Sequence, residues 1–150
     1  MLDLRQSPDV RAVLSKARTI AVLGAHPTQS RPAFYVPDYL FSQGYRILPV
    51  NPRFAGRGLA LWGQPIRATL AELGEPVHIV DIFRASDSVP DHLQDILAMD
   101  PRPGLVWLQQ GIRNDAVGQA VKAAGIGFIQ DRCTLADHRA MGIGRVGEGP

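Results

Sequence analysis

Short, continuously apolar runs alternate along the chain with longer segments whose apolar residues recur at helical spacing. This alternation is typical of repeated βα units, which form parallel sheets. We read five runs as strands: residues 19–23, 46–50, 77–83, 105–108 and 127–130. Because these runs do not alternate apolar and polar residues, we expect helices to cover both faces of the sheet.

Helical segments are expected between the strands and at both ends of the chain. They comprise a segment before residue 19, residues 33–43, residues 90–99, a segment after Asn114 and a short segment near Leu135. Gly44 and Gly125 directly follow two of these helices and are typical of helix C-termini. Asn114 suits an N-cap, because its side chain accepts a hydrogen bond from a free N–H of the first turn.

The pattern predicts an α/β fold: a Rossmann-like, doubly wound, mainly parallel five-stranded sheet with helices on both faces, in one domain over residues 1–141. Right-handed crossovers lead us to expect the strand order 3-2-1-4-5, with strands numbered along the chain. Residues 52–76 contain many Gly and Pro, so we expect mostly loop, one short strand at Ile66 and one helical turn near Leu70. The glycine-rich residues 142–150 are expected to form a disordered tail.

The charge balance excludes some classes of partner. The chain has 16 Lys+Arg and 14 Asp+Glu, a formal net charge of +2, and the basic residues are scattered rather than forming the patch that nucleic-acid binding requires. All basic residues except Lys16 and Lys122 are Arg, whose planar fork suits phosphate; an anionic small ligand and a compositional bias both account for this excess. Charges within residues 1–18 leave no apolar signal sequence or membrane span, so we expect a cytoplasmic protein without a membrane partner.

The residue types that usually perform catalysis form no recognisable constellation. Cys133 is the only cysteine, which excludes an intrachain disulfide. Arg132 beside it favours a thiolate that reacts with a thiol ligand, whereas burial would leave the cysteine inert, and both readings stay open. The histidines lack metal-ligand spacing and no serine occupies a G-x-S-x-G elbow, so we expect no metal site and no activity of the protein by itself.

The segment after the first predicted strand has features of a phosphate-binding loop, and ligands of doubly wound sheets bind beyond such strand ends. Gly24 lets a phosphate approach the backbone just before a helix begins, and Ser30 and Arg31 add a hydroxyl donor and a charged fork. His26 suits a hydrogen bond to phosphate. The G-x-G-x-x-G fingerprint is incomplete, because His26 and Gln29 occupy its second and third glycine positions, so a structural βα turn stays an alternative.

The next two strand ends also carry arginine. Arg53 suits a ribose that bears a phosphate, as in coenzyme A or NADP, rather than the free ribose of NAD; an exposed loop arginine is the alternative. Phe83 suits stacking on an adenine or burial in the core, and Arg84 suits a phosphate contact or the start of the next helix. Asp81 lies inside a strand, where we expect a structural hydrogen-bonding group.

Residues 20–24, 44–52, 81–84, 107–111 and 131–133, taken in order, resemble the bacterial and archaeal CoA-binding domain proteins. These are stand-alone relatives of the CoA-binding domain in succinyl-CoA synthetase. The resemblance covers about residues 10–141 and implies a Rossmann-like fold with CoA lying across the strand ends. It implies no ligase activity, because the phosphorylated histidine of the synthetase belongs to a further domain without a counterpart in this sequence.

The resemblance also implies a role for each part of the binding site. The phosphate-facing turn would consist of Gly24, Ala25, His26 and Pro27, with Ser30 and Arg31 at the start of the following helix. The phosphorylated ribose would be flanked by Asn51, Pro52 and Arg53. The adenine side would be formed by Phe83 and Arg84. The pair His26-Pro27 departs from the small polar residues expected in that turn, and Pro27 has no N–H to donate to a phosphate.

Together these observations predict a protein that binds coenzyme A or an acyl-CoA without catalysis, as a carrier, a sensor or a thiol-protecting module. An NADP-binding reductase or sensor is a second hypothesis, because Arg53 suits a phosphorylated ribose in either ligand. A third hypothesis is a structural scaffold that has a vestigial nucleotide site and self-associates into a homo-oligomer.

Overall fold

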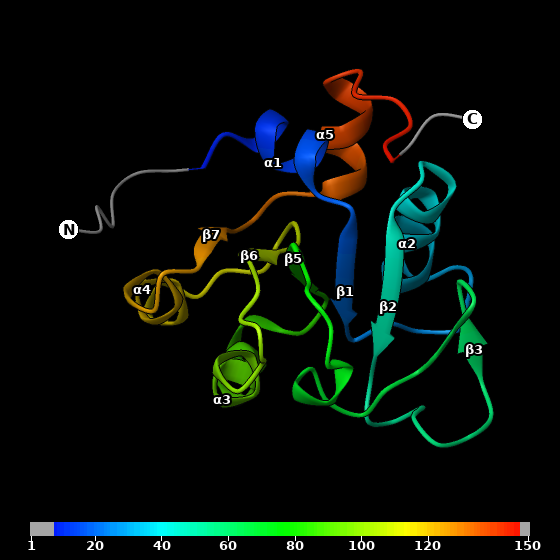
Figure 1. Cartoon of the computed structure of the whole chain (residues 1–150), viewed down its shortest axis with the longest axis horizontal. Helices are drawn as coiled ribbons and strands as arrows, with labels where there is room; N and C mark the ends of the chain where they lie inside the picture. Colours follow the sequence, from blue (N-terminus) through cyan, green and yellow to red (C-terminus); the bar gives the residue numbers. More distant parts are fainter. Residues whose placement is uncertain (1–7, 148–150) are drawn as a thin grey trace.

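A five-stranded parallel sheet forms the centre of the protein, whose computed structural model describes residues 8–147 (Figure 1). Its strands along the chain are β1 Thr19–Leu23, β2 Arg46–Val50, β5 Ile79–Ile82, β6 Leu105–Leu108 and β7 Gly127–Ile129. All five expected strands are confirmed; β5 is shorter than expected at both ends and β7 at its C-terminal end. Nearly every strand residue is buried, as continuous apolar runs require in a sheet covered on both faces.

The strand order is β2-β1-β5-β6-β7, so the expected order 3-2-1-4-5 is wrong in the place of its third strand. That strand, β5, pairs with β1 rather than with β2, in parallel and with Ile20 opposite Ile79. A sequence signal for this arrangement is Pro49 in the middle of β2. Proline cannot donate a ladder hydrogen bond and is therefore confined to edge strands. The expected order placed β2 between two other strands, which Pro49 disfavours.

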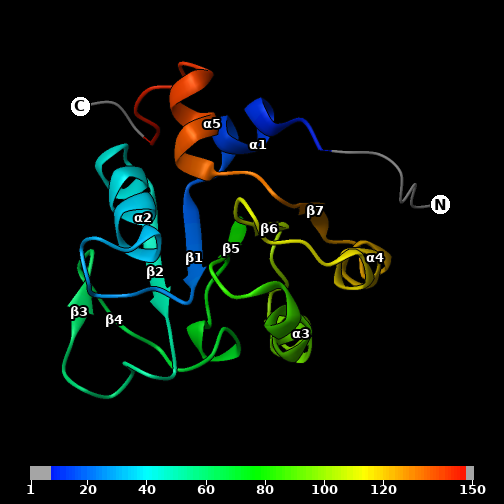
Figure 2. The same cartoon turned by 180° about the vertical axis from the view of Figure 1, so that it is seen from behind.

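Helices cover both faces of the sheet, as predicted (Figures 1 and 2). They are α1 Val10–Lys16, α2 Pro32–Ser42, α3 Leu93–Leu97, α4 Asp115–Ala123 and α5 Thr134–Ala140, with 3₁₀ segments at Ala71–Leu73 and Ser86–His92. α1, α2 and α5 cover one face, and α3 and α4 the other. The helix expected over residues 90–99 starts earlier, as a 3₁₀ segment that contains Pro90. Asn114 caps α4 as predicted, since its side chain accepts from the Val117 N–H at 3.0 Å.

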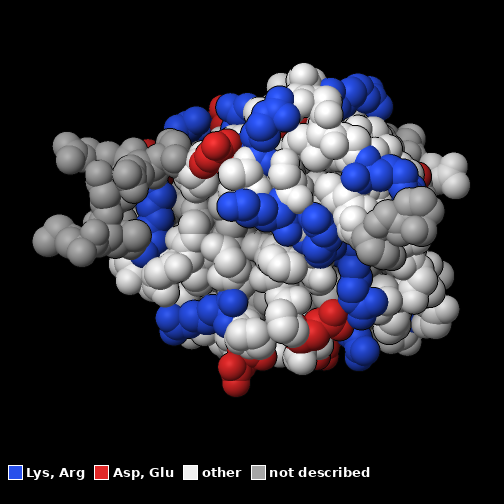
Figure 3. Space-filling model, turned by 45° about the horizontal axis from the view of Figure 1, so that its top comes forward, with Lys and Arg blue, Asp and Glu red and all other residues white. Residues whose placement is uncertain are grey.

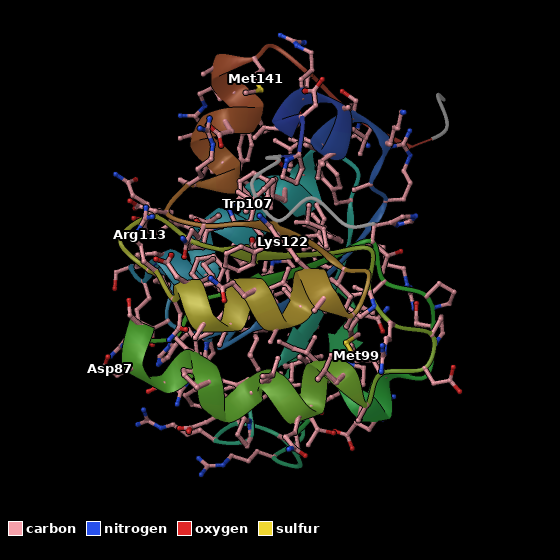
Figure 4. The ribbon with its side chains drawn as sticks, turned by 90° about the vertical axis from the view of Figure 1, so that its left-hand side faces the viewer. Asp87, Met99, Trp107, Arg113, Lys122 and Met141 are labelled. Atoms are coloured by element: carbon pink, nitrogen blue, oxygen red, sulfur yellow. The ribbon has the colours of Figure 1, made fainter. Side chains whose placement is uncertain are left out.

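Each face of the sheet packs against its own apolar cluster. One cluster lies under α3 and α4 and contains Val80 and Ile96. The other lies under α1, α2 and α5 and contains Leu14 and Trp107. Trp107 lies in the interior (Figure 4) and its indole N–H donates to the Arg132 carbonyl at 2.7 Å. The side chain therefore satisfies its single polar group while filling the core.

The segment expected to be mostly loop contains a short hairpin, β3 Ala60–Leu61 and β4 Gln64–Pro65. The short strand that we expected at Ile66 is β4, which ends one residue earlier, at Pro65. Ile66 itself is buried. Trp62 and Gly63 form the two-residue turn with φ angles of 54° and 77°, and such turns need positive φ at both positions. The helical turn expected near Leu70 is confirmed as the 3₁₀ segment Ala71–Leu73.

Residues 142–147 differ from the expected disordered tail, because they pack along the end of α2. The Val146 N–H donates to the Gln43 carbonyl at 2.7 Å, and Ile143 and Val146 pack against the core cluster under α1, α2 and α5. Gly44 has φ +100°, and a Cβ there would lie 2.3 Å from the Val146 oxygen, so only glycine fits beneath this segment. The rest of the expected tail, residues 148–150, lies outside the described residues, as do residues 1–7.

Basic side chains occur in several groups on the face drawn in Figure 3, with acidic side chains between some of them. None of the helices that the structure describes is both long enough and apolar enough to cross a membrane.

Candidate functional site

Two adjoining clefts lie at the edge where the parallel strands end, and the loops after β1 and β2 leave the sheet at this edge (Figures 1 and 2). The first cleft has a volume of about 360 Å³ and is lined by Leu23, Gly24, His26, Arg31, Ala33, Asn51, Pro52, Arg53, Phe54, Phe83, Arg84 and His92. The second has a volume of about 500 Å³ and is lined by Arg31, Pro32, Ala33, Tyr35, Val36, Phe83, Arg84, Ala85, Gln109, Gln110, Ile112, Cys133 and Leu135. The clefts border each other, because they share Arg31, Ala33, Phe83 and Arg84.

Gly24 directs the chain from β1 into the first cleft. Its φ is +92°, and a Cβ would lie 2.5 Å from the Phe83 carbonyl oxygen. Its N–H donates to the Val50 carbonyl at 2.8 Å. Because the loop passes so closely between the ends of β2 and β5, no side chain fits at this position, which explains the glycine independently of any ligand.

Asn51 joins the loops that follow β1 and β2. Its side-chain nitrogen donates to the Ala25 carbonyl at 2.9 Å, and its side-chain oxygen accepts from the Arg53 N–H at 3.0 Å. Asn51 lines the first cleft, yet both polar ends of its side chain are engaged by the backbone. It therefore positions Arg53 and the β1 loop relative to each other.

His26 presents a neutral ring beside the first cleft. Its Nδ1 accepts a hydrogen bond from the Thr28 N–H at 3.0 Å, so the neutral ring carries its hydrogen on Nε2. Burial, and then the positive charges of Arg31 and Arg53, lower the pKa of His26 below its usual value of 6.5. The ring also meets Phe54 edge-on, with centroids 4.9 Å apart. His26 can thus donate from Nε2 to an anion in the cleft.

The first cleft is positively charged. Arg31, Arg53 and Arg84 line it, and none of its lining residues is acidic. Among residues 8–147, these arginines form no ion pair with a carboxylate. The Arg53 guanidinium lies 5.2 Å from the centre of the Phe54 ring, and Arg84 Nε donates to His92 Nε2 at 3.3 Å. Their charges are therefore not neutralised by the described chain.

The N-terminus of α2 adds to this potential. Arg31 is its N-cap residue, its side chain makes no capping hydrogen bond, and Pro32 occupies the first turn. Ala33, in the same turn, lines both clefts. The positive end of the helix dipole therefore borders the groove at the point where the two clefts meet.

Most of the residues that the sequence nominates come together in the first cleft: Gly24, His26, Arg31, Asn51, Pro52, Arg53, Phe83 and Arg84. Ala25, Pro27 and Ser30 line neither cleft. Ala25 is fully buried, whereas Ser30 is exposed. Phe83 packs against the core and also lines both clefts. Burial in the core and contact with a ligand are therefore compatible for this residue. The sequence reasoning missed Phe54 and His92; an aromatic residue directly after Arg53 was the available signal for Phe54.

A buried polar cluster lies beneath the second cleft. Asp81 in β5 is fully buried, and Gln109 at the end of β6 donates from Nε2 to Asp81 Oδ1 at 2.7 Å and to Thr134 Oγ1 at 2.8 Å. The Thr134 hydroxyl donates to Asp81 Oδ2 at 3.2 Å. Burial raises the pKa of Asp81 to about 7, against the opposing effect of both hydrogen bonds. The expectation that Asp81 is a structural hydrogen-bonding group is confirmed.

Cys133 is half-buried and lines the second cleft but not the first. Arg132, which sequence reasoning placed beside the thiol, instead forms an ion pair with Asp137, with Nε 2.7 Å from Oδ2. Within the described residues, no group of three or more His, Cys, Asp or Glu could hold a metal ion.

The fold and the groove define a Rossmann-like α/β protein with a cationic cleft at the carboxyl ends of its strands. Residues 18–139 match the CoA binding domain family, and the chain belongs to that family. The resemblance noted from the sequence is therefore confirmed.

Known proteins resemble the chain in sequence, in fold or in both. A solved structure from Thermus thermophilus, named cell-free ID.343, is 53% identical and superposes with a TM-score of 0.82 over 88% of this chain and 96% of its own. The uncharacterized protein YneT of Bacillus subtilis is 29% identical over 87% of this chain and 92% of its own length. An acetyl-coenzyme A synthetase 1 from Ca. Korarchaeum cryptofilum, solved with phosphate and ADP, shares the fold at 20% identity and a TM-score of 0.55, over 95% of this chain and 27% of its own.

Proposed function

We propose that the protein binds coenzyme A or an acyl-CoA, with the phosphorylated nucleotide part in the first cleft, and that it acts as a non-catalytic carrier, sensor or thiol-protecting module. The observation that carries this proposal is the cationic lining of the cleft in a chain of the CoA binding domain family. The nucleotide part of CoA carries a diphosphate and a 3′-phosphate on its ribose. It is thus an anion that such a lining attracts.

The unpaired donors suit this anion. Arg31 and the start of α2 border the cleft, and His26 Nε2 offers a neutral donor in the same cleft as Arg31 and Arg53. A diphosphate in this cleft would receive charge-assisted hydrogen bonds from arginine together with the favourable end of the helix dipole. This role does not require the missing N–H of Pro27, which lines neither cleft.

Arg53 is the residue that would recognise the 3′-phosphate. Its backbone N–H is held by Asn51, and its side chain extends over Phe54 without a carboxylate partner in the described chain. The loop after the second strand of such sheets commonly contacts the ribose of a bound nucleotide. A phosphate on that ribose would lie within reach of an arginine fork that is already positioned.

The test is calorimetric titration of the reduced protein with CoA, dephospho-CoA and NADPH at one ionic strength. We expect CoA to bind most tightly. Arg53→Ala should weaken CoA binding by about 1.5 to 3 kcal/mol, roughly tenfold or more, because it removes a hydrogen bond to a charged group. It should leave dephospho-CoA nearly unaffected.

The matched control is Arg57→Ala. Arg57 lies near the same Phe54 ring but does not line the cleft, so its loss should change CoA affinity much less. Equal affinities for CoA and dephospho-CoA would remove the role of Arg53. Tighter binding of NADPH than CoA would favour an NADP-binding reductase or sensor. Binding of neither ligand by a stable oligomer would favour the scaffold.

A further inference from the structure

A buried residue of the second cleft presents a polar atom that has no hydrogen-bond partner in the described chain. Gln109 is only 5% exposed, and both hydrogens of its side-chain nitrogen are used, one by Asp81 and one by Thr134. Within residues 8–147, no hydrogen bond reaches its other polar atom, Oε1. No buried side-chain nitrogen or oxygen in the described chain lacks a partner, so Oε1 reaches the open space of the cleft that Gln109 lines.

The cluster fixes which way the amide points. The Thr134 hydroxyl donates its hydrogen to Asp81 Oδ2, so its oxygen is left to accept from the Gln109 nitrogen, which also donates to Asp81 Oδ1. The Gln109 nitrogen therefore faces both groups, which turns Oε1 towards the cleft. An otherwise buried glutamine thus presents a single, oriented acceptor.

We propose that the second cleft binds the pantetheine arm of CoA and that Gln109 Oε1 accepts a hydrogen bond from one of the amide N–H groups of that arm. This inference rests on the proposed function, because the nucleotide part in the first cleft would direct the arm into the second across their shared lining. Gln109 is then a specificity-determining residue for the arm.

The remaining lining suits this occupant. The walls are mostly apolar and include Tyr35, Val36 and Ile112, which match the methyl and methylene groups of the arm. The volume of about 500 Å³ lies within the range of small-molecule sites. A flexible chain that carries secondary amides between apolar groups is a ligand that an apolar cleft with one fixed acceptor recognises.

The experiment compares the affinities of CoA and adenosine 3′,5′-bisphosphate, which lacks the pantetheine arm. For the wild type we expect CoA to bind more tightly. Gln109→Leu should reduce this advantage roughly three- to tenfold, the loss expected for one hydrogen bond, and leave the affinity for the bisphosphate unchanged.

Thr134→Ser is the matched control. It removes a buried methyl group beside the same cluster but keeps the hydroxyl that accepts from Gln109 and donates to Asp81, so Oε1 stays in place, and Thr134 does not line the cleft. We expect lower stability with the CoA advantage retained. If Thr134→Ser loses the advantage as Gln109→Leu does, the glutamine acts through structure and the proposed contact is wrong.

Two further measurements test the cleft if Gln109→Leu does not fold. Ala85→Trp places a large ring at an exposed position of the lining and should lower the affinity for CoA towards that of the bisphosphate. Acetyl-CoA, whose own thiol is blocked, should slow alkylation of Cys133 by iodoacetamide, whereas the bisphosphate should not.

The outcomes separate the two proposals. If CoA and the bisphosphate bind equally well, and neither Ala85→Trp nor protection of Cys133 distinguishes them, the arm lies elsewhere while nucleotide binding stands. If neither ligand binds at all, the proposed function itself fails.

Discussion

At the scale of single residues, Asp81 combines a pKa typical of catalytic groups with a location that excludes direct catalysis. Burial raises its pKa to about 7, and strongly shifted carboxyl groups often mark active sites. Yet Asp81 is 0% exposed, and it influences the groove only through Gln109. The shift therefore reflects a structural role: this carboxyl group orients an amide, at a cost to stability when it ionises.

This cost predicts a pH dependence. The pKa of Asp81 rises from 3.8 to about 7 on folding, so between these values the native state holds a proton that the unfolded state has lost. Its contribution to stability consequently falls as pH rises through this window, by up to about 1.4 kcal/mol per pH unit. Asp81→Asn should remove this fall, because the amide does not ionise.

Urea unfolding of the wild type and Asp81→Asn at matched pH values isolates this contribution, because every other titrating group is common to both proteins. We expect the free-energy difference to shift in favour of the variant between about pH 5 and pH 7. A difference that is independent of pH, or that shifts towards the wild type, would mean that Asp81 is already ionised throughout this range.

The acceptor at Gln109 also shows where sequence reasoning stops at this scale. Gly24, Arg53 and Phe83 could be nominated because each stands directly after a strand, and strand ends converge at one edge. Gln109 follows a strand too, but its orientation depends on Asp81 and Thr134, which are 28 and 25 positions away in the sequence. Only the folded chain brings these side chains together.

At the scale of secondary-structure elements, the strands were predictable because a parallel strand buried on both faces is an uninterrupted apolar run. Their order was less accessible, because crossover rules permit several orders for the same strands. Pro49 contained the missing information, since it marks β2 as an edge strand. The prediction of a helix at residues 90–99 was wrong about where the helical segment begins, because Pro90 lies inside a 3₁₀ segment that starts at Ser86.

The C-terminal segment 142–147 is the element whose composition was most misleading. Its glycines indicate disorder, but Ile143 and Val146, which stand between these glycines in the sequence, pack against the core. We expect Ile143→Ala and Val146→Ala each to lower the free energy of unfolding by about 1 kcal/mol, the range for removing part-buried methyl groups.

Leu59→Ala is the control for this prediction. Leu59 is 41% exposed, so the same kind of truncation there should change stability by only a few tenths of a kcal/mol. Chemical denaturation measures all three variants. Values for Ile143 and Val146 no larger than that for Leu59 would show that the segment does not pack against the core in solution.

At the scale of the whole molecule, the groove joins segments that are far apart in the sequence. The first cleft is lined by the ends of β1, β2 and β5, and the second continues to the ends of β6 and β7 with the start of α5. A ligand that spans both clefts would therefore contact every loop at this edge of the sheet. Since it binds only the folded chain, its binding free energy adds to the stability of the whole domain.

Thermal unfolding with ligand tests this coupling. At a concentration about 100 times its Kd, CoA should stabilise the protein by about 2.7 kcal/mol, which raises Tm by roughly 5 to 10 °C in a domain of this size. Because the first cleft attracts the ligand through unpaired arginines, this increase should shrink as salt rises from about 0.05 to 0.5 M, where the Debye length falls well below the span of the site. Arg53→Ala should show a smaller increase and a weaker salt dependence than the wild type, because one of the attracting charges is gone. An increase that does not depend on salt would mean that apolar contacts in the second cleft, rather than the cationic first cleft, dominate binding.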